Sequence, residues 1–439
     1  MQAKISYPRV LFISHTPFSQ TSNNGKTFAS LLNGWPKGNI AQLYFHEVER
    51  PDMKFCNNYY RLTDKQILQG ILKVDKEKYC VNSIDAIQKV AAQDLIVSKS
   101  IRDRFGLLFF RDIMWGLNFW KTKELKDWIS LYNPDIIFFV GGASGFSYRI
   151  ASWIQDYLKV PLAVYFTDDY YINPRKSGFF KYLQYFVNTK PSIQKMIRRA
   201  SLCFVIGELM AKDYSLIFDK EFIPVMNSVE MSENLTLRSF NEEQQEIRMA
   251  YIGGLHYNRW NGLILLGDLL SEVKSKCKIE CYLDIYSTDD LSKEMLLKLN
   301  TLPLRYKGPL NSEQVKSKLI DYDALVHVES EDSESRRATK YSLSTKIPEY
   351  LGSKTPIIAF GPDEIASIRI LKDNNIGLVL TDLDSREVKI KRLVNFINNR
   401  NVRLDFSERG YYYALQNFDN KKIRSKVRDI IVKTVNDNK

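Results

Sequence analysis

The chain has 439 residues, of which 44% are hydrophobic, 26% charged and 13% aromatic. This composition is typical of a globular protein and excludes a disordered or fibrous chain, and the length predicts two or three domains. A net charge of +12 favours anionic partners such as nucleotide phosphates, nucleic acid or an acidic membrane surface.

Cysteine and histidine usage argues against a disulfide framework or a metal centre. The five cysteines form no Cys-x-x-Cys pair, and the four histidines are scattered along the sequence. No apolar run approaches the about 20 residues that span a bilayer, and the apolar stretch near the N-terminus is too short for a signal peptide. We expect a cytoplasmic protein without a metal or other cofactor, able to touch the inner face of a membrane from that side.

Short apolar runs, rich in β-branched and aromatic residues, predict strands along the whole chain. In the first half these runs are residues 10–14, 40–46, 135–141, 162–167, 202–206 and 222–225. In the second half they are residues 247–252, 279–286, 324–328, 356–360 and 377–380. Segments with helical spacing, such as 263–277, 313–322 and 347–352, separate most of them. Apolar strands that alternate with helices predict parallel sheets covered on both faces.

The runs are too many for one sheet, which rarely exceeds about ten strands. A polar, aperiodic stretch between Ser228 and Ile247 predicts an interdomain link. The predicted fold class is therefore α/β, with doubly wound Rossmann-like domains at 1–228 and 247–405 and a linker at 229–246. Residues 406–439 carry apolar positions at helical spacing, and we expect them to form a helical segment that packs across the domains.

The loop after the first predicted strand reads HTPFSQTSNNGKTFASLL. Gln20 stands where a Walker A loop needs glycine, which excludes that motif. Asn24 and Gly25 are instead predicted just ahead of a helix that begins at Lys26, at a strand-to-helix turn whose amides could receive a diphosphate. An ordinary βα turn is the alternative.

Two acidic residues, Asp168 and Asp169, directly follow the predicted strand 162–167. Ligands of parallel α/β sheets bind at the carboxyl ends of strands, so one carboxylate could accept the proton of a reacting hydroxyl. A helix-capping pair is the alternative. The glycine-rich segment 141–145 follows another strand, and small residues there would leave space for an acceptor.

Two basic, aromatic-rich segments, 102–126 and 174–199, could face an anionic lipid interface. The alternative is a pair of core helices with solvated basic faces. Single-stranded nucleic acid could use the same residue types, but no nucleic-acid-binding motif is present, so no nucleic-acid partner is expected.

The second domain opens with a strand followed by GGLHYNRWNGL. Gly253 and Gly254 would let a ligand approach the main chain, and Arg259 could pair with phosphate oxygens through its planar guanidinium. A tight turn with a solvated arginine is the alternative.

The stretch YSLSTKIPEYLGSKTPIIAFGP predicts a short helix capped by Ser344 and Thr345. Lys346 and Glu349 are three residues apart, so they share a helix face and could address one ligand. The lysine suits a diphosphate and the carboxylate suits the vicinal hydroxyls of a ribose. The alternative is a solvated ion pair.

These parts, in this order, resemble bacterial glycosyltransferases of the GT-B fold, in the group with two spaced glutamates in the C-terminal domain. The opening strand and loop, IPVMNSV, GGLHYNR, FGP and the lysine–glutamate helix carry the resemblance, which covers essentially the whole chain. It implies that Glu349 binds the donor ribose and that Arg259 binds the donor diphosphate. The sequence departs from the pattern at the first glutamate, which would be residue 341 but is Tyr341.

Other departures affect the same site. The family's lysine shortly after the arginine is missing, and Lys346 could supply that charge. Glu329 and Glu331, just after a predicted strand, could substitute for the absent glutamate.

The resemblance implies transfer of a sugar from a nucleotide-sugar donor to a saccharide acceptor, which could be lipid-linked, in the synthesis of a bacterial surface polysaccharide or glycoconjugate. Two alternatives stay open, a nucleotide-sugar epimerase on the same fold and a non-catalytic nucleotide-sugar binder in an assembly complex.

Overall fold

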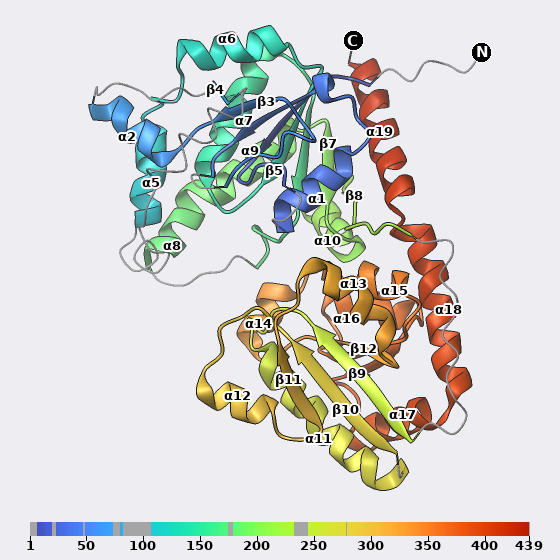
Figure 1. The fold of residues 1–439 in the computed structure, drawn as a ribbon. Coiled ribbons are helices and arrows are strands. Elements are labelled where there is room, and N and C mark those ends of the chain that lie inside the picture. Colours follow the sequence, from blue (N-terminus) through green and yellow to red (C-terminus); the bar gives the residue numbers. More distant parts are fainter. Residues whose placement is uncertain are drawn as a thin grey trace, which may run out of the picture. The chain divides into compact units, whose positions relative to one another are not determined.

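The computed structural model describes residues 7–19, 23–46, 49–72, 80–81, 107–173, 179–231, 245–277 and 279–438. It divides into two compact units (Figure 1): Met1–Val225 with Ile423–Lys439, called unit 1, and Met226–Lys422, called unit 2. Most of the predicted linker and the first residues of both basic segments, 102–106 and 174–178, lie outside the described residues.

Unit 1 contains a sheet in which all neighbouring strands are parallel except β3 and β4. In spatial order its strands are β4 (Cys80–Val81), β3 (Asn58–Arg61), β2 (Ile40–Tyr44), β1 (Val10–Ser14), β5 (Ile136–Gly141), β6 (Leu162–Phe166), β7 (Leu202–Val205) and β8 (Ile223–Pro224). Val10 of β1 stands opposite Ile40 on one side and Ile136 on the other. Every residue of β1, β2, β5 and β6 is buried, as expected for a parallel sheet covered on both faces.

The helices of unit 1 surround this sheet (Figure 1). They are α1 (Asn23–Leu32), α2 (Asp64–Leu72), α5 (Leu107–Gly116), α6 (Lys123–Tyr132), α7 (Gly145–Leu158), α8 (Phe179–Gln184), α9 (Lys190–Arg199), α10 (Glu208–Phe218) and the greater part of α19 (Asn420–Asp437). A π-helical turn, Tyr185–Thr189, joins α8 to α9. Pro191 explains this turn, because proline lacks an N–H and its ring clashes with the carbonyl four residues earlier.

Unit 2 contains a fully parallel sheet with the order β11 (Leu304–Gly308), β10 (Glu280–Tyr286), β9 (Glu246–Ile252), β12 (Ala324–Val328), β13 (Ile357–Gly361) and β14 (Leu378–Thr381). Its helices are α11 (Arg259–Cys277), α12 (Lys293–Leu299), α13 (Ser312–Asp321), α14 (Ser333–Thr339), α15 (Lys346–Gly352), α16 (Ala366–Asp373), α17 (Arg386–Asn398) and α18 (Arg400–Asn417). The core joins strand residues such as Met249 and Val326 to Leu266 of α11 and Phe396 of α17.

The predicted fold class is confirmed, and each of the eleven predicted strand runs overlaps a strand. Strands β3, β4 and β11 were not predicted. The helix α1 begins at Asn23 and not at Lys26, so Asn24 and Gly25 belong to its first turn. The C-terminal tail is helical but begins earlier than expected, at Arg400, and it consists of the two helices α18 and α19.

The strand order places two topological switch points in the molecule. Successive connections run in opposite directions from β1 and β5 in unit 1, and from β9 and β12 in unit 2. In open α/β sheets ligands bind outside the carboxyl ends of the strands at such points, because the two loops diverge there and leave a crevice. A ligand site of unit 2 is therefore expected at the residues that follow β9 and β12.

Candidate functional site

The loop between β9 and α11 is a compact turn. A Cβ atom on Gly254 would lie 2.4 Å from Cε1 of the His256 ring, so glycine at this position leaves room for the histidine. Tyr257 and Asn258 both have left-handed backbone conformations, with φ of 56° and 55°, and Arg259 then begins α11. Such a conformation is unfavourable for tyrosine, and strain of this kind is often found at ligand sites.

Asp289, which follows β10, fixes the position of this turn. Its Oδ2 accepts hydrogen bonds from the backbone N–H groups of Leu255, at 2.6 Å, and His256, at 3.1 Å. The same oxygen lies 3.6 Å from Nδ1 of His256. A single carboxylate therefore holds both the backbone of the turn and the histidine ring.

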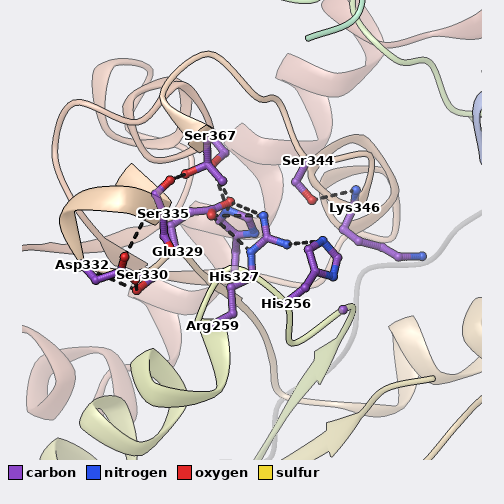
Figure 2. A network of polar contacts seen from close by, with 12 residues as sticks. His256, Arg259, His327, Glu329, Ser330, Asp332, Ser335, Ser344, Lys346 and Ser367 are labelled. Atoms are coloured by element: carbon purple, nitrogen blue, oxygen red, sulfur yellow. Dashed lines mark hydrogen bonds and ion pairs between the residues drawn. The ribbon is translucent and has the colours of Figure 1, made fainter. Parts of the chain in front are cut away.

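Arg259 points from the first turn of α11 to Glu329, directly after β12 (Figure 2). Its Nε and Nη2 donate to the Glu329 carboxylate at 3.1–3.2 Å. The Glu329 side chain is 1% exposed, and its Oε1 also lies 3.3 Å from both Ser367 Oγ and His327 Nε2. Burial alone would raise the pKa of Glu329, but Arg259 and His327 outweigh it and hold the pKa below its usual value. The two loops at the switch point are thus joined by a buried ion pair.

This pairing corrects one expectation. Glu329 cannot replace the missing glutamate as a sugar ligand, because its carboxylate is buried and bonded to Arg259, Ser367 and His327. Glu331 is half-buried and stays a candidate. Tyr341, at the position of the first glutamate, is 2% exposed and belongs to the core.

The helix α15 contacts the end of β9. The hydroxyl of Tyr350 accepts from the backbone N–H of Ile252 and donates to its carbonyl, both at 3.1 Å. Ile252 directly precedes Gly253. The structure therefore brings three predicted groups to the carboxyl edge of one sheet: the glycine turn, Arg259, and the helix that carries Lys346 and Glu349.

Lys346 and Glu349 form an ion pair with each other, with 2.8 Å between Nζ and Oε2. The lysine and glutamate side chains are 28% and 27% exposed, so both lie partly open to solvent. The expected cap is only partly present. Ser344 Oγ accepts from the backbone N–H of Lys346 at 3.3 Å, but the Thr345 side chain makes no capping bond because its backbone is already helical.

In unit 1, Asn24 and Lys26 are exposed in the first turn of α1, and Gly25 is buried between them. A Cβ on Gly25 would lie 2.5 Å from the carbonyl oxygen of Pro17 and 2.8 Å from Ser19 Cβ. Glycine at this position is therefore needed for α1 to pack against its own loop. Whether the amides of this turn also bind a phosphate stays a prediction.

The loop after β1 is held by Gln42, a buried residue of β2 that the sequence did not single out. Its Oε1 accepts from the N–H of Phe18 at 2.9 Å, and its Nε2 donates to Ser14 Oγ at 2.9 Å. A glutamine inside the apolar strand IAQLY was the signal for this role.

Asp168 and Asp169 follow β6 but differ in their surroundings. Asp169 accepts from the backbone N–H groups of residues 171–173 at 2.7–2.9 Å and from the hydroxyl of Tyr214 at 2.7 Å. These bonds make Asp169 the centre of a loop turn after β6, and they do not cap a helix as the alternative interpretation expected, because residues 171–173 are not helical. Asp168 is half-buried, and its Oδ2 lies 3.4 Å from the hydroxyl of Tyr170. The catalytic role of either carboxylate stays a prediction.

No family model and no curated protein sequence matches the chain. Solved structures do match. HepE of Anabaena, determined in complex with UDP and glucose, is 11% identical, with a TM-score of 0.57 over 97% of this chain and 100% of HepE. The sucrose-phosphate synthase of Thermosynechococcus elongatus is 9% identical, with a TM-score of 0.59 and coverage of 97% and 98%. A glycosyltransferase from Rickettsia africae is 11% identical, with a TM-score of 0.59 and the same coverage of the two chains.

The chain has a GT-B-like fold. This likeness spans both units and the C-terminal helices, whereas the low identities limit it to the fold.

In the ranges that the structure describes, no three His, Cys, Asp or Glu residues are grouped so that they could hold a metal ion. No helix within those same ranges is both long and apolar enough to cross a membrane.

Proposed function

We propose that this chain is a glycosyltransferase that moves a sugar from a nucleotide-sugar donor to a hydroxyl of a saccharide acceptor, and that it resembles the group with two spaced glutamates but lacks the first glutamate, which is Tyr341 here. The observation that carries the proposal is the grouping of the Gly253–Gly254 turn, Arg259 and α15 at the carboxyl edge of the unit 2 sheet. The shared fold supports it, since HepE was solved with UDP and glucose.

In this proposal unit 2 binds the donor. Arg259 and the backbone amides at the start of α11, a helix of 19 residues, address the diphosphate. The ion pair between Lys346 and Glu349 opens when the donor binds, because the ribose hydroxyls can donate to the carboxylate while the ammonium turns to a phosphate oxygen. Both side chains are partly exposed, which allows this exchange.

The proposed reaction breaks the bond between the anomeric carbon and the phosphate oxygen and forms a bond from that carbon to the acceptor oxygen. The nucleoside diphosphate leaves with the bonding electrons, and Arg259 and Lys346 stabilise the charge that develops on it. Asp168 is proposed to accept the proton of the acceptor hydroxyl. Because protein cations perform the stabilisation, we propose that no divalent metal is required.

We further propose that the acceptor is linked to a lipid and that unit 1 contacts the cytoplasmic face of a membrane. In unit 1, α5 packs against both α2 and α8. These three helices expose large apolar side chains: Leu68, Leu72, Ile113, Phe179 and Tyr182. The nearby α9 carries basic residues and no acidic ones. Apolar side chains beside cations suit an anionic lipid interface.

The donor class is tested by thermal unfolding of the full chain with a panel of nucleoside diphosphates and their sugars. We expect one base to raise Tm by several degrees, because a ligand that binds only the folded state stabilises it. Nucleoside diphosphate should then be released only when a saccharide acceptor is present, equally with and without EDTA. Sugar conversion without acceptor would indicate an epimerase, and stabilisation without release would indicate a binder.

The membrane contact is tested separately by cosedimentation with vesicles of anionic lipid. The wild type should bind, and the variant Ile113→Ser/Phe179→Ser should bind much less. Equal binding of the two proteins would contradict the proposed surface.

A further inference from the structure

His256 lies between the anion Asp289 and the cation Arg259 at the carboxyl edge of unit 2, and Figure 2 shows the histidine ring beside Arg259. Its Nδ1 is 3.6 Å from Asp289 Oδ2, and its Nε2 is 3.4 Å from Nη1 of Arg259. The histidine side chain is 58% exposed. Because a guanidinium can only donate, Nε2 of His256 acts as an acceptor toward Arg259, which places the ring proton on Nδ1, facing Asp289.

The orientation of Arg259 determines which of its nitrogens faces a ligand. Glu329 binds Nε and Nη2, so the guanidinium fork is held in one direction and Nη1 is the nitrogen that borders His256. Glu329 also offsets part of the arginine charge, since its carboxylate is buried beside the guanidinium. A diphosphate bound here would therefore be held more tightly if a second cation lay beside the arginine, because the arginine charge is already paired with Glu329.

The absence of a side chain at position 254 is a separate observation. A Cβ there would come within 2.4 Å of the His256 ring, so Gly254 keeps the space in which the ring stands beside Arg259. Asp289 holds the backbone N–H of His256 as well as lying beside its ring. The turn is thus built to keep this histidine beside the arginine.

We propose that His256 and Nη1 of Arg259 form a phosphate-binding pair that takes up one proton from solvent when it is filled. The proton goes to Nε2 of His256, which changes from an acceptor of the arginine N–H into a donor to a phosphate oxygen. Nη1 donates to the same phosphate group, and Nδ1–H stays directed at Asp289. This step rests on the proposed function only for the identity of the phosphate, which would be the donor diphosphate.

The charges around the ring give the direction of the pH dependence. The charged groups facing His256 are Arg259 on α11, Asp289 after β10 and Glu329 after β12, and the Tyr257 ring packs beside it. Burial and then Arg259 lower the pKa of His256 below its usual value, although Asp289 and Glu329 oppose them. A bound phosphate adds negative charge and raises that pKa. Binding therefore tightens as the pH falls through the interval between the two values.

The test is isothermal titration of the full-length protein with inorganic pyrophosphate, repeated in two buffers of different ionisation enthalpy at about pH 6.5. The wild type should take up a fraction of a proton on binding. His256→Gln should lose that uptake and bind about threefold to tenfold more weakly, as expected for one charge-assisted hydrogen bond to an exposed ligand. His46→Gln, in unit 1, is the matched control and should retain the wild-type uptake.

Pyrophosphate itself can take up protons when it binds, and this contribution is the same in the wild type and in His256→Gln. The difference in proton uptake between the two proteins therefore comes from His256. Equal uptake and affinity in wild type and His256→Gln would overturn the inference, as would a failure of the wild type to bind pyrophosphate. The outcome is separable from the proposed function. Proton uptake that depends on His256 in a protein without transferase activity would support the phosphate-binding pair and contradict the proposed function. Sugar transfer that does not involve His256 would support the proposed function and contradict the pair.

Discussion

At the scale of single residues, the pair of Arg259 and Glu329 joins stability to the proposed chemistry. The arginine side chain is 14% exposed and the glutamate side chain 1% exposed, so removal of either partner leaves the other in a poorly solvated place. Breaking a buried ion pair costs more than the pair contributes, because the remaining charge loses its compensation. Arg259 therefore cannot be tested as a ligand by truncation alone.

We predict that Arg259→Ala lowers the free energy of unfolding by about 3 kcal/mol, since it isolates the Glu329 carboxylate. The double variant Arg259→Met/Glu329→Gln should recover most of this loss, because it removes both charges. Urea unfolding measures the stability, and both variants should still bind pyrophosphate poorly. An Arg259→Ala protein as stable as the wild type would contradict the burial of the pair.

Acid unfolding of the wild type and of Glu329→Gln tests the direction in which Glu329 makes stability depend on pH. The pKa of Glu329 is lower in the folded protein than in the unfolded chain. Its contribution to stability is therefore present above the unfolded-state pKa and is lost as the pH falls through the folded-state value. The free energy of unfolding of Glu329→Gln should therefore depend less on pH than that of the wild type in the acid range.

The sequence predicted individual residues of the site but not their partners. Arg259 and Gly254 stand in a turn with a recognisable composition, whereas Glu329 is 70 residues from Arg259 and Asp289 is 34 from Leu255. Such pairings depend on strand order, which a single sequence does not reveal. His256 was missed for the same reason, because a lone histidine shows its role only beside Arg259 and Asp289.

At the scale of secondary structure, the position of α15 depends on its two neighbours. Tyr350 bonds to the backbone of β9 on one side. On the other side Gly410 of α18 packs against α15, where a Cβ on the glycine would lie 2.8 Å from Leu351 Cδ2 and 3.4 Å from the carbonyl oxygen of Ile376. A small residue in α18 thus sets how closely the two helices approach.

We predict that Gly410→Leu displaces α15 and weakens nucleoside diphosphate binding, because overpacking forces helices apart at a cost of about 1–3 kcal/mol. Titration with the nucleotide found in the thermal screen measures the effect. Tyr412→Leu is the control on the same helix, since Tyr412 is 61% exposed. Equal nucleotide affinity in the two variants would show that α15 does not depend on this contact.

Strands that are apolar and fully buried, such as β1 and β13, were readily predicted. The strands β3, NYYR, and β11, LRYKG, were not predicted because they contain few apolar residues, and β11 is only partly buried at an edge of its sheet. The start of α1 was placed three residues late because asparagine and glycine are typical of turns. In the structure Gly25 serves the helix itself by allowing contact with Pro17.

At the scale of the whole chain, the last helix belongs to the first unit. The α19 residues Ile423, Val427, Ile431 and Val435 are buried at intervals of four, which is one face of a helix. Arg424 Nε donates to the carbonyl of Ser30 in α1 at 3.0 Å. Unit 1 is therefore completed by residues nearly 200 positions after its main part ends.

We predict that Ile431→Asp destabilises unit 1 by roughly 3 kcal/mol or more, since a charge replaces a buried aliphatic side chain. Hydrogen exchange should show faster opening in peptides from unit 1 and little change in those from residues 245–400. Lys433→Asp is the matched control, because Lys433 is exposed on the same helix. Equal exchange in both variants would mean that α19 does not stabilise unit 1.

The return of the chain to unit 1 also has a consequence for biosynthesis. Residues Met226–Lys422 leave the ribosome before Ile423–Lys439 during synthesis. The whole sequence of the second unit is therefore available before that of the first unit. The first unit must wait for the last helix, α19, to emerge from the exit tunnel, so the surface that Ile423, Val427, Ile431 and Val435 cover stays open during translation. A nascent chain stalled before that helix should accordingly recruit chaperones to its earlier half.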